Sequence, residues 1–172
     1  SDDVHNSSLQ PGSVDLDFYL SVVEATGKVT LSVADSAAEK KTPGPPAGED
    51  KKKPGLAFAT SPAVFMADYI RYNMKTGEVL TGDNPRAELP DAVLSSRGPI
   101  KASITDKTVE AGNGIDLRAG ADISAHAGRV TVDYGDRTAF LTENVTGARG
   151  NDTFSAGSVM IEYPKTGSVI YF

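Results

Sequence analysis

The stretch Phe65-Met-Ala-Asp-Tyr-Ile-Arg-Tyr-Asn-Met-Lys-Thr-Gly-Glu-Val79 decides the fold, because the chain contains a second version of it. The second version reads Phe154-Ser-Ala-Gly-Ser-Val-Met-Ile-Glu-Tyr-Pro-Lys-Thr-Gly-Ser-Val169. A weaker third copy covers residues 123–141, with a polar turn at 135–138. Each copy is an apolar strand, a turn and a second strand. Repetition of such a unit predicts a stacked β-architecture with a long continuous surface.

The copies follow one another at a nearly constant step. Tyr134 and Tyr163 are 29 residues apart, and Tyr72 and Tyr134 are 62 apart, which is about twice that step. A further unit is therefore expected near position 103, where residues 99–110 are a degenerate candidate. Residues 22–33 supply half a unit near the N-terminus.

Composition restricts the class of protein. A chain of 172 residues, 39% hydrophobic and 23% charged, is ordinary for one soluble globular domain. The net charge of −6 argues against binding to nucleic acid, which needs clustered Lys and Arg. The absence of cysteine excludes disulfides, thiolate catalysis and sulfur-bound zinc. No apolar run approaches the roughly 20 residues of a membrane span.

The chain divides into an arm and one domain. Residues 1–13 are polar and lack periodicity, so we expect a flexible arm, followed by a single domain over 14–172. Alternating apolar residues predict a first hairpin over 15–33, with Thr26-Gly27 as its turn. A Pro-, Gly- and Lys-rich loop is expected as an insertion at about 34–57. Lys51-Lys-Lys53 within it is better explained as solvated loop than as a docking patch.

Gly- and Pro-containing turns recur at short intervals from residue 56 to the end, which is typical of an all-β sandwich, barrel or solenoid. No window shows a helical apolar stripe, so we expect almost no helix. Within the copies Ile70 and Tyr72 stand two residues apart and share one strand face. Phe65 has the opposite parity, so either a β-bulge or a change of sheet is expected between it and Ile70.

The sequence shows no constellation for catalysis. The two histidines, His5 and His126, are too few for a histidine metal site, and no Gly-x-Ser-x-Gly motif marks a nucleophile. Asp15 with Asp17, and Asp133 with Asp136, are better explained as charges on a solvated sheet face. We therefore expect a protein that is not an enzyme and has neither cofactor nor metal.

The repeated phrase, above all Ala67-Asp-Tyr-Ile-Arg-Tyr-Asn-Met-Lys-Thr-Gly-Glu-Val-Leu-Thr-Gly-Asp-Asn84, resembles the repeat of the OstA-like family. This family of lipopolysaccharide-transport proteins includes LptA, LptC and the N-terminal domain of LptD. The resemblance covers residues 63–90 and 123–172 well and residues 16–33 weakly. It implies an all-β jelly-roll shaped like a half-open taco, built of antiparallel strand-turn-strand units.

By this resemblance the chain is a periplasmic bridge module of outer-membrane biogenesis, and acyl chains of lipid A lie in an apolar groove. The implied partners are lipopolysaccharide or a similar amphipathic lipid, and other OstA-like proteins through edge-strand pairing. An end-to-end homo-oligomer is also implied. The groove lining expected from strand register comprises Val29, Leu31, Ile70, Tyr72, Val79, Val132, Tyr134, Phe140, Val159, Ile161, Tyr163 and Val169.

Two other hypotheses fit the same strands. In a structural or adhesion β-solenoid, the apolar register is packed as a closed core and takes no lipid. In a carbohydrate-binding β-sandwich, exposed aromatic side chains would line a flat face, but the chain has no Trp and only 7% aromatic residues. Sequence alone does not distinguish a groove wall from a dry core, because both are alternating apolar strands.

Overall fold

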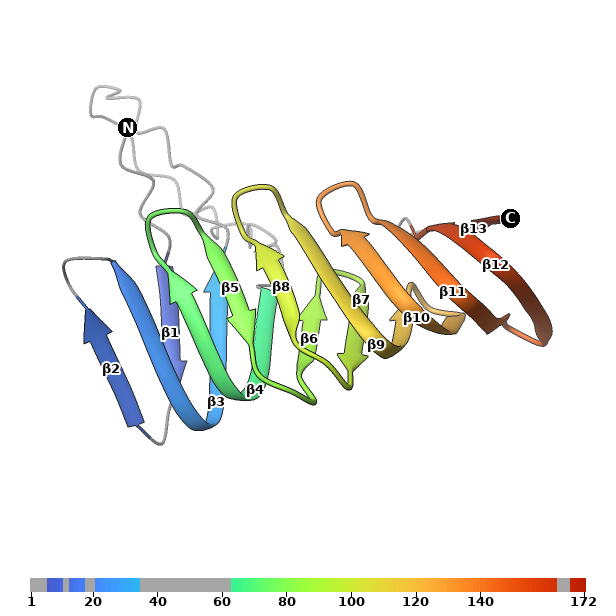
Figure 1. The fold of residues 1–172 in the computed structure, drawn as a ribbon. Helices are drawn as coiled ribbons and strands as arrows, with labels where there is room; N and C mark the ends of the chain where they lie inside the picture. Colours follow the sequence, from blue (N-terminus) through green and yellow to red (C-terminus); the bar gives the residue numbers. More distant parts are fainter. Residues whose placement is uncertain (1–5, 11–12, 18–20, 35–62, 164–167) are drawn as a thin grey trace, which may run out of the picture.

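A computed structural model describes residues 6–10, 13–17, 21–34, 63–163 and 168–172. These residues form thirteen β-strands and no helix (Figure 1). The strands are β1 Asn6–Gln10, β2 Ser13–Asp17, β3 Val22–Ala34, β4 Ala63–Asn73, β5 Glu78–Thr81, β6 Arg86–Leu89, β7 Ala92–Ser96, β8 Ile100–Ser103, β9 Thr108–Ala119, β10 Ile123–Asp133, β11 Thr138–Arg149, β12 Asp152–Glu162 and β13 Val169–Tyr171.

All thirteen strands belong to one antiparallel sheet that is folded into two layers (Figure 1). Each long strand takes part in both layers, and several of them have different neighbours in their two halves. In β4, residues 70–73 pair with β5, whereas residues 64–66 pair with β6. In β9, residues 108–111 pair with β8 and residues 115–119 with β7. We call the layer with β2, β5, β8 and β13 the front layer and that with β1, β6 and β7 the back layer.

The fold between the layers follows a line of β-bulges, which we call the bend line. Along it two residues of one strand oppose a single residue of the next. The two-residue sides are Gly27-Lys28 in β3, Asn113-Gly114 in β9 and Glu143-Asn144 in β11. Gly27, Asn113, Gly114, Glu143 and Asn144 all have positive φ, between 57° and 93°. Here a strand turns from one layer into the other without ending.

The bend line explains the change of parity seen in the sequence. Phe65 lies in the back half of β4 and Ile70 in the front half, and both side chains are buried. Because the strand changes layer between them, side chains of opposite parity point into the same core. Both expected features are therefore present in one form, because the bulge carries the strand from one layer of the sheet into the other.

The turns of the front layer form a second regular feature, the front turn row. Its three turns begin at Asn73, Ser103 and Asp133, which are thirty residues apart. At each of these positions a short polar side chain accepts a hydrogen bond from the backbone N–H three residues on, at 2.8–3.2 Å. Successive turns are also joined, since the N–H groups of Ile104 and Tyr134 donate to the carbonyls of Gly77 and Lys107, both at 2.9 Å.

The back layer has an equivalent back turn row. Gly120 N–H donates to the Asp91 carbonyl at 2.8 Å, and Gly150 N–H donates to the Asp122 carbonyl at 3.0 Å. Asp91, Gly120 and Gly150 share a left-handed conformation, with φ of 58–60°. Consecutive hairpins therefore repeat one geometry, which confirms the all-β, antiparallel fold of repeated strand-turn-strand units predicted from the sequence.

Two boundaries expected from the sequence differ from the structure. Asn6–Gln10 is not part of a flexible arm but forms β1, which pairs with residues 30–34 of β3. A polar segment can do this because strand pairing uses backbone groups and needs no apolar pattern. Thr26-Gly27 is not a hairpin turn but part of the bend line inside β3. The expected loop at about 34–57 lies, apart from Ala34, outside the described residues.

Candidate functional site

The core between the two layers contains most of the side chains predicted to line a groove. The residues concerned are Val29, Leu31, Ile70, Tyr72, Val79, Val132, Tyr134, Val159, Ile161 and Tyr163, all of them buried. They belong to one apolar cluster that extends from β3 to β12 and includes many alanines. The prediction of one shared inward face is correct for these ten residues. Their role in binding lipid stays a prediction.

Phe140 and Val169 do not belong to this face, and their predicted inward position was wrong. They lie on the outer surface, 50% and 41% exposed, while Ala139 and Ser168 beside them are buried. The prediction aligned Tyr134 with Tyr72. In the thirty-residue repeat, however, the residue equivalent to Tyr72 is Val132. Counted from Val132, the residue equivalent to Val79 is Ala139, so the sequence alignment was shifted within the turn.

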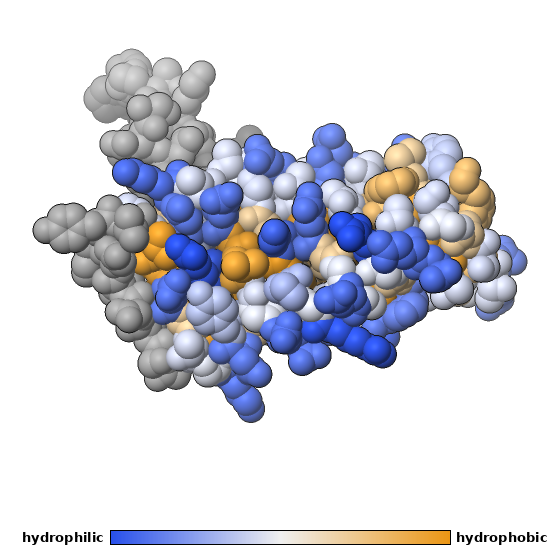
Figure 2. Space-filling view, viewed as in Figure 1, coloured by the Kyte–Doolittle hydropathy of each residue, from blue (hydrophilic) through white to orange (hydrophobic). Residues whose placement is uncertain are grey.

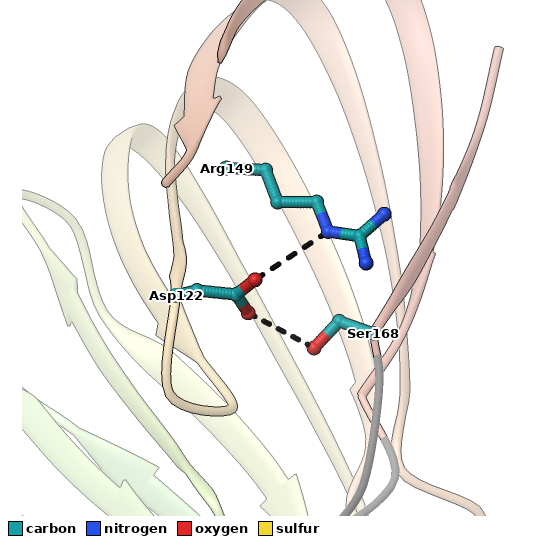
Figure 3. Close-up of polar contacts among 3 residues, drawn as sticks. All are labelled: Asp122, Arg149 and Ser168. Carbon is teal, nitrogen blue, oxygen red and sulfur yellow. Dashed lines mark hydrogen bonds and ion pairs between the residues drawn. The ribbon is translucent and has the colours of Figure 1, made fainter. Parts of the chain in front are cut away.

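The edge of the fold opposite the bend line, which we call the mouth, is closed by side chains of the two turn rows. Arg137 of the front row donates from Nε to Asp91 Oδ2 of the back row at 2.8 Å. One repeat further on, Ser168 Oγ donates to Asp122 Oδ1 at 3.3 Å, and Arg149 Nε lies 3.4 Å from Asp122 Oδ2 (Figure 3). Asp122 is thus held between Arg149, at the end of β11, and Ser168, which directly precedes β13 of the front layer.

Tyr163 lies beneath the first of these contacts with its hydroxyl unsatisfied. The side chain is 0% exposed, and its hydroxyl has no hydrogen-bond partner among the described residues. Burial raises the pKa of this phenol, and the negative charges of Asp133 and Asp91 raise it further against the opposing effect of Arg137. The pKa of Tyr72 is also raised by burial. Both tyrosines are therefore held as neutral phenols inside the core.

Two surface hollows lined by described residues lie on the outer faces of the layers. One, of about 470 Å³, is lined by front-layer residues around Leu80 and Lys101. The other, of about 560 Å³, lies on the back layer over β6, β7, β9, β10 and β11. Neither opens between the layers, so the tyrosine face is not reached from these hollows.

The outer front face carries an apolar row at the C-terminal end. Phe140, Met160 and Tyr171 are direct neighbours on β11, β12 and β13, and all three are exposed. Figure 2 shows apolar surface at this end of the molecule and further apolar patches along its length. The residue after Tyr171, Phe172, meets the ring of Phe154 edge to face, with centroids 5.9 Å apart, and Phe154 packs against the core.

Sequence reasoning missed the residues that close the mouth. Asp91, Asp122 and Arg137 are ordinary turn residues in the sequence, and nothing in a single turn indicates a partner in the opposite layer. The available signal was the repeat itself, because Asp91 and Asp122 are separated by 31 residues, close to one repeat.

The described residues hold no group of three or more His, Cys, Asp or Glu side chains suited to a metal ion. His126 lies on the outer back face, where its Nδ1 is 3.1 Å from Asp116 Oδ1. In the part of the chain covered by the structure, no helix has the length and apolarity needed to cross a bilayer.

Comparisons with known proteins give little further information. No protein-family model and no curated protein matches the chain. Among solved structures, one match is LptH of Pseudomonas aeruginosa, described as the LptA-homologous periplasmic component of the conserved lipopolysaccharide transport device. The match covers 95% of this chain and 80% of LptH, at 9% sequence identity and a TM-score of 0.31. At that similarity the two chains share too little geometry for an inference about function.

Proposed function

We propose that this chain is a non-enzymatic bridge module of lipid transport that takes acyl chains between its two layers. The observation that carries the proposal is the single apolar interior, which is continuous from β3 to β12. The OstA-like character of the repeated phrase supports a periplasmic location and lipid A as the source of the acyl chains. Each square ångström of apolar surface covered by a chain stabilises the complex by about 25 cal/mol.

The mouth is the entrance in this proposal. One long side of the interior is continuous backbone along the bend line, which does not part without breaking strands. On the other side, the contacts described between the turn rows are made by side chains, Arg137 to Asp91 and Ser168 to Asp122. The first is an ion pair at the surface, a contact that contributes only about 0–1 kcal/mol, and the second is a single side-chain hydrogen bond. The layers can therefore separate there at a smaller cost than at the bend line.

Photo-crosslinking tests the proposal with two neighbouring aromatic positions. A photoreactive phenylalanine analogue replaces Tyr134, which is 8% exposed inside the core, or Phe140, which is 50% exposed outside it. We expect lipopolysaccharide to be labelled from position 134 and not from position 140. Asp91→Asn combined with Asp122→Asn removes charges at the mouth and should increase labelling from position 134. Labelling from position 140 alone would contradict an interior site.

A closed-core scaffold is the second candidate, and the burial of the tyrosine face favours it. Tyr72, Tyr134 and Tyr163 are 2%, 8% and 0% exposed, so an acyl chain reaches them only after the layers part. A scaffold of this kind binds no lipid, whether or not the charges at the mouth are removed. Absence of labelling from position 134 in the wild type and in the Asp91→Asn, Asp122→Asn variant would support the scaffold.

A further inference from the structure

The hollow on the outer back face brings polar donors together on three adjacent strands. In one row across the sheet, Asp116 of β9 is opposite His126 of β10, which is opposite Thr146 of β11. In the next row, Arg118 is opposite Ser124, which is opposite Ala148. All six residues line the hollow of about 560 Å³. The small side chain of Ala148 leaves space at one end of the second row.

Arg118 differs from most arginines of this acidic chain in having no carboxylate partner within the part of the chain that the structure describes. Among the described residues, five other arginines lie within 3.4 Å of a carboxylate oxygen: Arg71 with Glu24, Arg86 with Glu88, Arg129 with Glu143, Arg137 with Asp91 and Arg149 with Asp122. The direct neighbours of Arg118 on both adjacent strands are Val93 and Ser124, which are uncharged. Its guanidinium is therefore available to a ligand.

The acidic side chains nearest to Arg118 are already engaged. Asp116 is 3.1 Å from His126 Nδ1, and Glu88 is 3.1 Å from two nitrogens of Arg86. Ser124 stands two residues before His126 on β10, and Thr146 is opposite His126 on β11, so both hydroxyls line the same hollow.

We propose that this hollow is a binding site for an oxyanion of the phosphate or sulfate class. Arg118 supplies a planar fork of N–H donors that matches two oxygens of such a group. The hydroxyls of Ser124 and Thr146 supply further donors to the remaining oxygens. The site lies on the opposite side of the sheet from the apolar interior, so it does not depend on the proposed lipid function.

Titration of the isotope-labelled chain with sodium phosphate or sodium sulfate, at ionic strength held constant with chloride, tests the site by NMR. We expect saturable shifts confined to amides of β7, β9, β10 and β11. Arg118→Gln should weaken binding about tenfold, because it removes a charge-assisted fork. Arg97→Gln is the matched control, since Arg97 is also exposed and without a carboxylate partner in the described residues, but lies outside the hollow.

Shifts that do not saturate, or that Arg97→Gln reduces as much as Arg118→Gln does, would overturn the proposal in favour of diffuse attraction. A second measurement separates two sources of the same chemistry. Sedimentation with vesicles of phosphatidic acid in phosphatidylcholine, lost on Arg118→Gln, assigns the site to a lipid headgroup. Binding of free phosphate with no binding to these vesicles assigns it to a small soluble phosphate. Failure to bind either probe would also overturn it.

Discussion

Single residues determine how firmly the interior is closed, and Tyr163 is the most informative of them. Its hydroxyl is buried, without a hydrogen-bond partner among the described residues, in a core built mainly of Val, Ile, Leu and Ala. An unsatisfied buried hydroxyl costs free energy that neighbouring packing must offset. Tyr72, at 2% exposure, has no such orphaned atom among the described residues and serves as the comparison.

Tyr163→Phe removes the unsatisfied hydroxyl and keeps the ring. We expect the free energy of unfolding to rise by about 1 kcal/mol. Urea denaturation followed by circular dichroism measures the change, with Tyr72→Phe as the control that should change less. A loss of stability in Tyr163→Phe would mean that the hydroxyl has a partner in solution.

The same phenol predicts how stability depends on alkaline pH. Its folded-state pKa is raised above the unfolded value of about 10. The neutral phenol is thus favoured by folding, and this contribution is complete below pH 10 and lost as the pH rises toward the folded-state pKa. The wild type should therefore lose stability more steeply above about pH 10 than Tyr163→Phe. Parallel slopes for the two proteins in denaturation between pH 9 and 11 would contradict this.

At the scale of elements, the bulged strands are what turn one sheet into two layers. Gly147 of β11 lies just beyond the bend line and pairs with Phe154 of β12. A Cβ at Gly147 would overlap the Phe154 ring and the backbone carbonyl of Ser124. Because a backbone carbonyl cannot move aside as a side chain can, this close approach of β10, β11 and β12 requires glycine.

Gly147→Ala should therefore destabilise the fold by about 1–3 kcal/mol, the usual cost of overpacking. Gly157→Ala is the matched control on the adjacent strand, since a Cβ there meets nothing within 4 Å. Thermal unfolding of both variants measures the difference. Equal melting temperatures would mean that β11 and β12 shift apart at little cost.

The elements also show which parts of the fold sequence reasoning could reach. The repeat predicted the strands, the antiparallel class and ten of the twelve inward positions, because alternation of apolar residues directly reports a buried face. It misplaced Phe140 and Val169 because the tyrosines Tyr134 and Tyr163 stand at the turns and not at the position of Tyr72. Contacts such as Arg137 with Asp91 are pairings between layers, and local patterns carry no information on them.

At the scale of the whole molecule, the described residues leave strand edges unpaired at the C-terminal end of the sheet. Residues 152–156 of β12 pair only with β11 among the described residues, and β13 pairs only with β12. Unpaired strand edges of this kind favour the addition of another strand. The predicted end-to-end assembly with a second copy or another OstA-like protein would use these edges.

Thr153→Lys combined with Ser155→Lys places two charges on the exposed part of this edge. If chains associate end to end, the variant should shift sedimentation velocity profiles toward the monomer at high concentration, because charges on an edge oppose strand addition. Thr105→Lys with Thr131→Lys adds the same charge at exposed positions away from the edge. An equal shift in this control would indicate general repulsion.

Because the turns of the front turn row are thirty residues apart, the length of the molecule is set by the number of these intervals. Each interval adds two strands to both layers, and neighbouring strands are about 4.8 Å apart, so each interval lengthens the molecule by about 10 Å. Deleting or duplicating one whole interval would change the span by that increment and leave the inward face, the bend line and the turn contacts in phase. Gene duplication could thus have set the distance that the chain reaches without redesigning its interior.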